Sequence, residues 1–228
     1  MSDFGEGLRA AWQLLATDAE IRAIILRTLA ISAAATVCAV TLGVPAGYAL
    51  ARTRFRGRSL VLGLVNTGMG MPPVVVGLIV WLVLARGGVL GSLNLLYTPQ
   101  AMVIAQFLIA LPLVVGFTAA SVQALPARLP ELLQSLGATR AQRLWYLCRE
   151  ARLGLLAAVM AAFGAIISEV GAAMTVGGNL RGSTRVLTTA IVTVTGRGEL
   201  GQALALGLIL LLLAFMVNLI LTLVQQRR

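Results

Sequence analysis

The chain has 228 residues, of which 59% are hydrophobic and 11% charged, and its mean hydropathy is +0.93. An average soluble domain carries roughly 25% charged residues, so this composition indicates an integral membrane protein, which we interpret as one domain over residues 1–228. The net charge of +10 does not indicate nucleic-acid binding, because the basic residues are spread along the flanks of apolar runs.

The basic side chains are all Arg, and the chain has no His. A lysine-dependent phosphate loop, Ser-His or Cys-His catalysis and the usual His-containing metal sites are therefore excluded. We expect no catalytic residue, metal site or cofactor in this chain. If ATP drives the protein, ATP and its Mg²⁺ bind another chain.

The predicted elements are all helices, because a lipid-facing strand would leave its backbone groups unpaired. Residues 1–23 mix Trp and Leu with charged residues and predict an interfacial amphipathic segment. A loop, 125–152, separates the third and fourth of five apolar stretches that are long enough to cross a bilayer. We therefore predict an all-α polytopic bundle with spans at 24–50, 60–85, 101–124, 153–176 and 200–224.

The distribution of Arg predicts the orientation in the membrane. Eleven Arg residues lie in the first loop, in or just before 131–152, and at the C-terminus, whereas seven lie on the opposite side. Cytoplasmic loops carry the excess of basic residues, so the C-terminus and 125–152 are predicted to be cytoplasmic and the N-terminus outside. The four Arg of the first loop also suit contact with anionic membrane lipids.

The charged segment 131–152 predicts two short helices separated at Gly137, with Thr139 as the N-cap of the second helix. The first helix has an apolar stripe beside a charged face, which favours docking to another protein. That stripe consists of Leu132, Leu133 and Leu136.

Two stretches inside the spans are candidates for a pathway or gate. The sequence G-M-G-M-P-P-V-V-V-G-L contains Met71, Pro72, Pro73 and Val74, and it is either a packing kink or a bent helix that lines a pathway. The second stretch contains Ser168, Glu169 and Gly171 in the fourth span.

Glu169 lies so deep in its span that it must face protein or water. Its carboxylate is either part of a gate near the pathway or a group satisfied inside the protein. In the second case it accepts a hydrogen bond or pairs with Arg181 or Arg185.

The outer stretch V-G-G-N-L-R-G-S-T-R contains Asn179, Arg181 and Arg185. It precedes a predicted helix at 184–194 capped by Ser183. Arg side chains and the N-H groups at a helix start suit an anion, and Arg also suits a contact with an external binding protein. A solvated loop is the third alternative.

Several motifs resemble those of known transporters. E-L-L-Q-S-L-G-A-T-R, residues 131–140, resembles the coupling loop of permease subunits of ATP-binding-cassette importers. M-P-P-V-V-V-G-L at 71–78 and S-E-V-G-A at 168–172 resemble molybdate permeases. V-G-G-N-L-R-G, T-R-V-L-T-T-A-I and R-E-A-R-L-G-L-L-A-A-V are similar to tungstate-import permeases of this family.

The resemblance implies a type I importer permease that works as a homodimer by alternating access. Its partners would be an ATP-binding subunit and an extracytoplasmic oxyanion-binding protein. The substrate is expected to be tungstate, with molybdate or sulfate as alternatives and a non-transporting membrane scaffold as the alternative from another class. The residues expected to contact the ATP-binding subunit are Glu131, Leu132, Leu133, Gly137, Ala138, Thr139 and Arg140.

Overall fold

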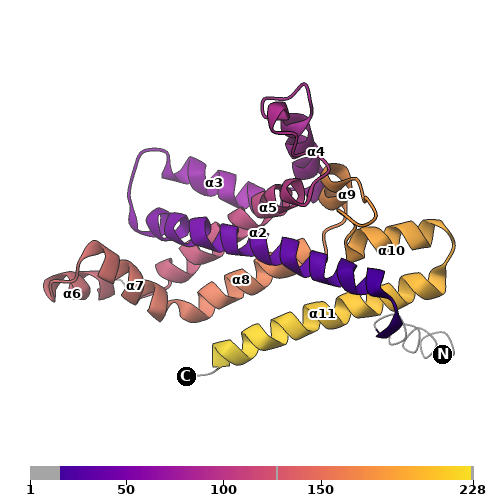
Figure 1. Cartoon of the computed structure of the whole chain (residues 1–228). Coiled ribbons are helices and arrows are strands. Elements are labelled where there is room, and N and C mark those ends of the chain that lie inside the picture. The colour runs from indigo at the N-terminus through magenta and orange to yellow at the C-terminus, as the bar shows by residue number, and fades with distance from the viewer. Residues whose placement is uncertain (1–15, 127, 227–228) are drawn as a thin grey trace.

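The computed structural model describes residues 16–126 and 128–226, and within these ranges the regular structure is entirely helical. The all-α bundle predicted from the sequence is confirmed. Most of the predicted interfacial segment, residues 1–15, lies outside the described residues. The bounds of the helices, shown in Figure 1, are α2 Ala19–Arg52, α3 Arg58–Met69, α4 Pro73–Leu84, η1 Gly91–Leu93, α5 Pro99–Gln123, α6 Leu129–Ser135, α7 Arg140–Glu150, α8 Arg152–Ile167, α9 Gly171–Gly177, α10 Leu187–Gly196 and α11 Leu200–Gln226.

Three of these helices, α2, α5 and α11, are each long and apolar enough to cross a membrane. Helix α2 begins at Ala19, five residues before the predicted start of the first span, because Asp18 caps it. The Asp18 carboxylate accepts hydrogen bonds from the backbone N-H groups of Glu20 and Ile21 at 2.8 and 3.2 Å. These bonds satisfy two donors that the first turn of a helix leaves free.

The other predicted spans are bent or interrupted. Helices α3 and α4 replace the stretch 60–85 and meet at 104°, since Pro72 lacks a backbone donor and Pro73 starts a new helix. The stretch 153–176 is divided into α8 and α9, and α7 joins α8 at 75°. If each bent pair counts as one span, the described residues contain up to five spans.

The centre of the bundle is the close crossing of α2 and α5, along which small residues bring the two backbones together. A Cβ atom built on Gly47 would lie 2.6 Å from the carbonyl oxygen of Val115, and one built on Gly43 would lie 2.8 Å from Cγ1 of Val114. Small residues such as these two glycines allow membrane helices to pack tightly. Any larger side chain here would force the helices apart.

The bundle has two ends that carry different segments (Figure 1). Helices α6 and α7, the loop between α2 and α3, and the C-terminal end of α11 lie at one end. The start of α2, the α9–α10 loop and helix α10 lie at the other end. An apolar cluster from α2, α10 and α11, including Ile24, Leu187 and Leu206, joins the helices at this second end.

Candidate functional site

Helix α6 ends in a turn whose backbone conformation favours glycine. Gly137 has φ +77°, a left-handed conformation that side chains with a Cβ rarely adopt. Its N-H donates to the carbonyl of Gln134, and the N-H of Ala138 donates to the carbonyl of Leu133, both at 3.0 Å. This pair of bonds is a Schellman motif, which satisfies the last carbonyls of α6 and reverses the chain into α7.

Helix α7 then starts with a reciprocal cap. The Thr139 hydroxyl accepts from the N-H of Gln142, and the Gln142 side-chain oxygen accepts from the N-H of Thr139. Arg143 of α7 donates to the side-chain oxygen of Gln134 at 3.0 Å, which ties α7 to α6. The predicted cap at Thr139 is confirmed, and the α6–α7 segment has a defined shape of its own.

The α6–α7 segment, residues 129–150, carries exposed apolar side chains although it projects from the bundle (Figure 1). Leu132 and Leu136 of α6 are 56% and 74% exposed, and Trp145 of α7 is 68% exposed. Glu131 and Arg140 are exposed beside them, whereas Leu133 is half-buried. These side chains give the projecting surface the apolar character that is common at protein–protein interfaces.

The two interruptions of the spans lie against each other. Helices α4 and α9 cross so closely that a Cβ built on Gly77 would lie 2.6 Å from Cα of Ala172. A Cβ built on Gly171 would lie 2.3 Å from Cγ2 of Val74. The structure therefore brings together two predicted pathway stretches that are almost 100 residues apart.

Of the other predicted pathway residues, Met71, Pro72 and Ser168 are exposed and Pro73 is half-buried. Their exposure places these residues on the surface of the single chain, beside the α4–α9 crossing. That position is compatible with either a pathway or a contact with another chain.

Glu169 is satisfied within the break between α8 and α9. Its carboxylate accepts a hydrogen bond from the N-H of Ala172 at 2.9 Å, at the start of α9. Its carbonyl accepts from the hydroxyl of Thr188 at 3.0 Å. Of the two partners considered from the sequence, the internal hydrogen bond is present, whereas Arg181 and Arg185 pair elsewhere.

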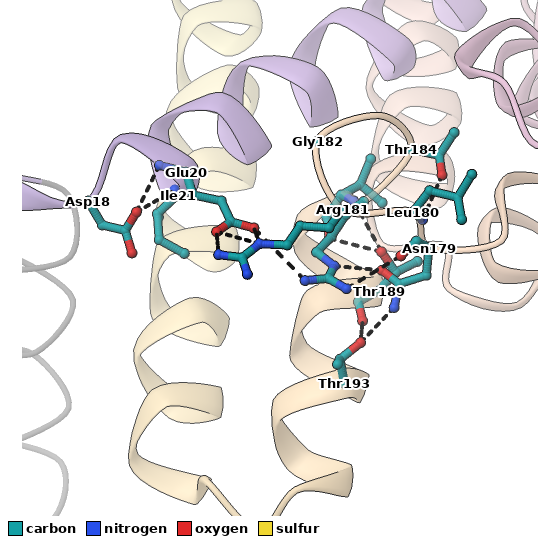
Figure 2. Close-up of polar contacts among 12 residues, drawn as sticks. Asp18, Glu20, Ile21, Asn179, Leu180, Arg181, Gly182, Thr184, Thr189 and Thr193 are labelled. Carbon is teal, nitrogen blue, oxygen red and sulfur yellow. Dashed lines mark hydrogen bonds and ion pairs between the residues drawn. The ribbon is translucent and has the colours of Figure 1, made fainter.

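The outer polar cluster consists of Glu20, Asn179, Arg181, Arg185 and Thr193, and Figure 2 shows its contacts. The Glu20 carboxylate forms an ion pair with Arg181 and lies 3.9 Å from Nη1 of Arg185. Arg185 Nε donates to the side-chain oxygen of Asn179 at 3.1 Å, and Asn179 donates to the Thr193 hydroxyl at 2.7 Å. The hydrogen bond to Glu20 raises the pKa of the Arg181 guanidinium above its ordinary value.

The start of α2 holds the loop that carries this cluster. Arg27 donates to the carbonyls of Arg185 and Gly182 at 2.8 and 3.0 Å. The Thr28 hydroxyl accepts from the N-H of Leu187 at 3.0 Å. The predicted cap at Ser183 is wrong, because α10 begins at Leu187 and its first turn is capped by a hydroxyl from α2.

The outer polar cluster borders a pocket of about 250 Å³, which Asp18, Arg197 and Gln202 also line. The Arg181 side chain is 75% exposed, whereas that of Arg185 is 19% exposed and held by its hydrogen bonds. The exposed guanidinium can exchange its carboxylate partner for another anionic group, while Arg185 shapes the loop. Among the described residues, no group of three His, Cys, Asp or Glu side chains could hold a metal ion.

Glu20 and Thr193 are the residues of this cluster that the sequence interpretation missed. For Glu20 a local signal existed. The signal available was Asp18, an N-cap residue with an acidic first turn after it, which marks a helix start before residue 24. Glu20 and Arg181 are 161 residues apart in the sequence, so no local pattern predicts their pairing.

Comparisons with known proteins place the chain among transport proteins. Residues 39–228 match the profile of the family described as "Binding-protein-dependent transport system inner membrane component". The tungstate uptake system permease protein TupB of Peptoclostridium acidaminophilum is 37% identical over 99% of this chain and 100% of its own length. A probable anion ABC transporter permease protein of Haloferax volcanii is 42% identical over 84% of each chain.

A solved structure supports the fold. A chain of the MetNI methionine ABC transporter, in an inward-facing conformation, matches 90% of this chain and 94% of its own length with a TM-score of 0.73. The sequence identity is 18%, so this likeness concerns the arrangement of the helices alone.

Proposed function

The chain belongs to the family of binding-protein-dependent transport system inner membrane components, and we propose that it is the permease subunit of an ATP-driven tungstate importer. The observation that carries this proposal is the similarity to a tungstate uptake permease along 99% of the chain. The exposed apolar face of the α6–α7 segment supports it, since such a subunit needs a surface for the protein that supplies the energy.

Tungstate is favoured over molybdate because the sequence identity to permeases named for tungstate uptake is higher than that to permeases named for molybdenum transport. A second tungstate uptake permease, that of Campylobacter jejuni, is 35% identical over 73% of the chain. Permeases named for molybdenum transport are 27% and 26% identical in Haemophilus influenzae and Escherichia coli, and 33% identical over 61% of this chain in Haloferax volcanii. Both oxyanions are tetrahedral dianions of nearly equal size, so molybdate is the second candidate and sulfate the third.

The α6–α7 segment is proposed to dock on an ATP-binding subunit, where ATP and Mg²⁺ bind. Leu132 and Leu136 would enter an apolar groove, while Glu131 and Arg140 would make polar contacts at its rim. This end of the bundle would face the cytoplasm, in agreement with its Arg residues. Movement of the docked segment would tilt α8 and open the pathway alternately to the two sides, because α7 is joined directly to α8.

The opposite end is proposed to face an extracytoplasmic oxyanion-binding protein. Arg181 would contact an acidic group of that protein, because its guanidinium is exposed and already pairs with a carboxylate. Asn179 and Arg185 would hold the loop in shape. Two copies of the chain would enclose the pathway, with the α4–α9 crossing and its exposed neighbours Met71 and Ser168 beside it.

The experiment that tests this function measures cell-associated tungsten and molybdenum by elemental mass spectrometry. A strain that lacks the chain is compared with strains carrying the intact gene and a Gly137→Trp copy. We expect tungsten accumulation to fall in the deletion strain and to be restored by the intact gene only. If neither metal changes, the tungstate and molybdate assignments fail, and sulfate uptake or a scaffold role would be examined next.

A further inference from the structure

Helix α3 has one face that packs within the chain and one face that does not. Val65, Gly68 and Met69 pack against α5: a Cβ on Gly68 would lie 2.9 Å from Cβ of Pro112. A Cβ on Gly116 of α5 would lie 2.6 Å from Sδ of Met69. Asn66 and Thr67, which lie between Val65 and Gly68 in the sequence, are exposed on the side of α3 that faces away from α5.

The side chains of Asn66 and Thr67 differ from most polar side chains in the long apolar helices. Several of those satisfy their hydrogen-bonding groups within their own helix: Thr41 donates to the carbonyl of Val37 at 2.7 Å, and Asn218 donates to the carbonyl of Ala214 at 2.9 Å. In the described part of the chain, the side chains of Asn66 and Thr67 have no hydrogen-bond partner. Their donors are therefore free for a partner outside the chain.

The depth of the two side chains excludes lipid as that partner. Asn66 lies eight residues after Arg58, the start of α3, and hence about 12 Å along the helix at 1.5 Å per residue. The hydrocarbon core is about 30 Å thick, so Asn66 is near its middle when α3 enters the core at Arg58 and runs across it. Lipid tails cannot accept a hydrogen bond from an amide, and an unsatisfied amide there is strongly unfavourable. In that position water, an anion or protein suits the Asn66 amide and the Thr67 hydroxyl better than lipid does.

We propose that Asn66 and Thr67 form a contact site for the tetrahedral oxyanion in the middle of the membrane, donating amide and hydroxyl hydrogen bonds to its oxygens. This inference rests on the proposed transport function and adds to it the residues that the substrate would touch. Both donors are neutral, which suits a site of passage, since a site that conducts must bind its ion weakly enough to release it.

The surroundings of the pair agree with a passage. Gly63 and Gly70 flank it on the same helix face, and a Cβ built on Gly63 would meet nothing within 4 Å. The break at Gly70 follows directly, so the N-terminal end of α4 lies next to the C-terminal end of α3. The positive end of the α4 dipole offsets the negative end of the α3 dipole for a passing anion.

The test uses the complete transporter in proteoliposomes, with Cys38 and Cys148 replaced by Ser because both are free thiols. Single cysteines are introduced as Asn66→Cys, Thr67→Cys and, as the matched control, Thr41→Cys. The control position is also exposed within a span, but on α2. A negatively charged methanethiosulfonate is used as the probe, because it reacts with thiols that water and anions reach.

We expect the cysteines at 66 and 67 to react at least tenfold faster than the one at 41, and tungstate to slow their reaction. Reaction as slow as at position 41, in a complex that still takes up tungsten, would overturn the proposal. Labelling reports the access of water and anions directly, so it tests the site even in a transporter that carries neither tungsten nor molybdenum. Failure to carry either metal would overturn the proposed function and not this inference.

A second measurement separates a substrate contact from a contact between two copies of the chain. Asn66→Leu should lower the rate of tungsten uptake about tenfold, with assembly of the complex unchanged in size-exclusion chromatography, while Thr41→Val leaves uptake unchanged. Unchanged uptake in Asn66→Leu would contradict the proposal. Loss of assembly in that variant would equally contradict it, because the amide would then bind a partner chain and not the substrate.

Discussion

The turn at Gly137 offers a perturbation whose cost can be separated into backbone and packing. A Cβ added at Gly137 would meet no atom within 4 Å, so substitution by Ala creates no clash. The cost is confined to the left-handed backbone at φ +77°, which is about 1–2 kcal/mol for a residue with a Cβ. Since each 1.4 kcal/mol is a factor of ten, Gly137→Ala should lower the population of the intact turn roughly 5- to 30-fold relative to alternative turns.

The assay is hydrolysis of ATP by the complete transporter, stimulated by the substrate-loaded binding protein. We expect Gly137→Ala to reduce this stimulation several-fold while thermal unfolding of the bundle stays the same, because the α6–α7 segment projects from it. Gly137→Asn is the matched control: Asn also adds a Cβ, but it adopts the left-handed conformation at lower cost. Its stimulation should lie close to that of the unmodified protein.

Two results would contradict this role of the turn. The first is full stimulation in Gly137→Ala, which would show that the turn geometry does not matter for coupling. The second is an equal loss in the Ala and Asn variants, which would show that bulk at position 137, and not backbone conformation, interferes with the partner.

Three further pairs of variants test other parts of the structure. Gly77→Ala should destabilise the bundle by about 1–3 kcal/mol in chemical unfolding, because its methyl group would overlap the crossing helix, whereas Gly207→Ala, in open space, should not. Glu169→Gln keeps the capping oxygen and should retain transport, while Glu169→Ala should lose about 1 kcal/mol of stability; failure of the Gln variant would indicate a need for charge. Arg181→Ala should weaken stimulation by the binding protein without changing the thermal midpoint, whereas Arg185→Ala should lower that midpoint; the opposite pattern would reverse the two roles.

Local rules predicted the features that depend on a few neighbouring residues. Thr139 precedes a helix with Gln142 at the third position, and the cap follows from that spacing alone. Gly137 marked the end of α6 for the same reason. The long apolar runs identified α2, α5 and α11, because their length and hydropathy exceed what a soluble helix needs.

Features that depend on distant contacts were not predictable in this way. Pro72 and Pro73 predicted a break between α3 and α4, but no local pattern gives its angle of 104°. The break after Ile167 contains no proline and is stabilised by the Glu169 carboxylate, which replaces a helical hydrogen bond at the start of α9. The pairing of Glu20 with Arg181 likewise required the folded bundle, since it joins two residues that are 161 positions apart.

The crossing of α4 and α9 also limits how this sequence can diverge. The backbones at Gly77 and Ala172 are so close that the pair shares the space of a single methyl group. Position 77 is already at the minimum, and a Cβ there would meet the backbone Cα of residue 172, so shrinking residue 172 to Gly would not make room for it. The residue sizes at positions 77 and 172 are therefore constrained together. In relatives with a larger residue at 172, we expect α4 and α9 to lie farther apart.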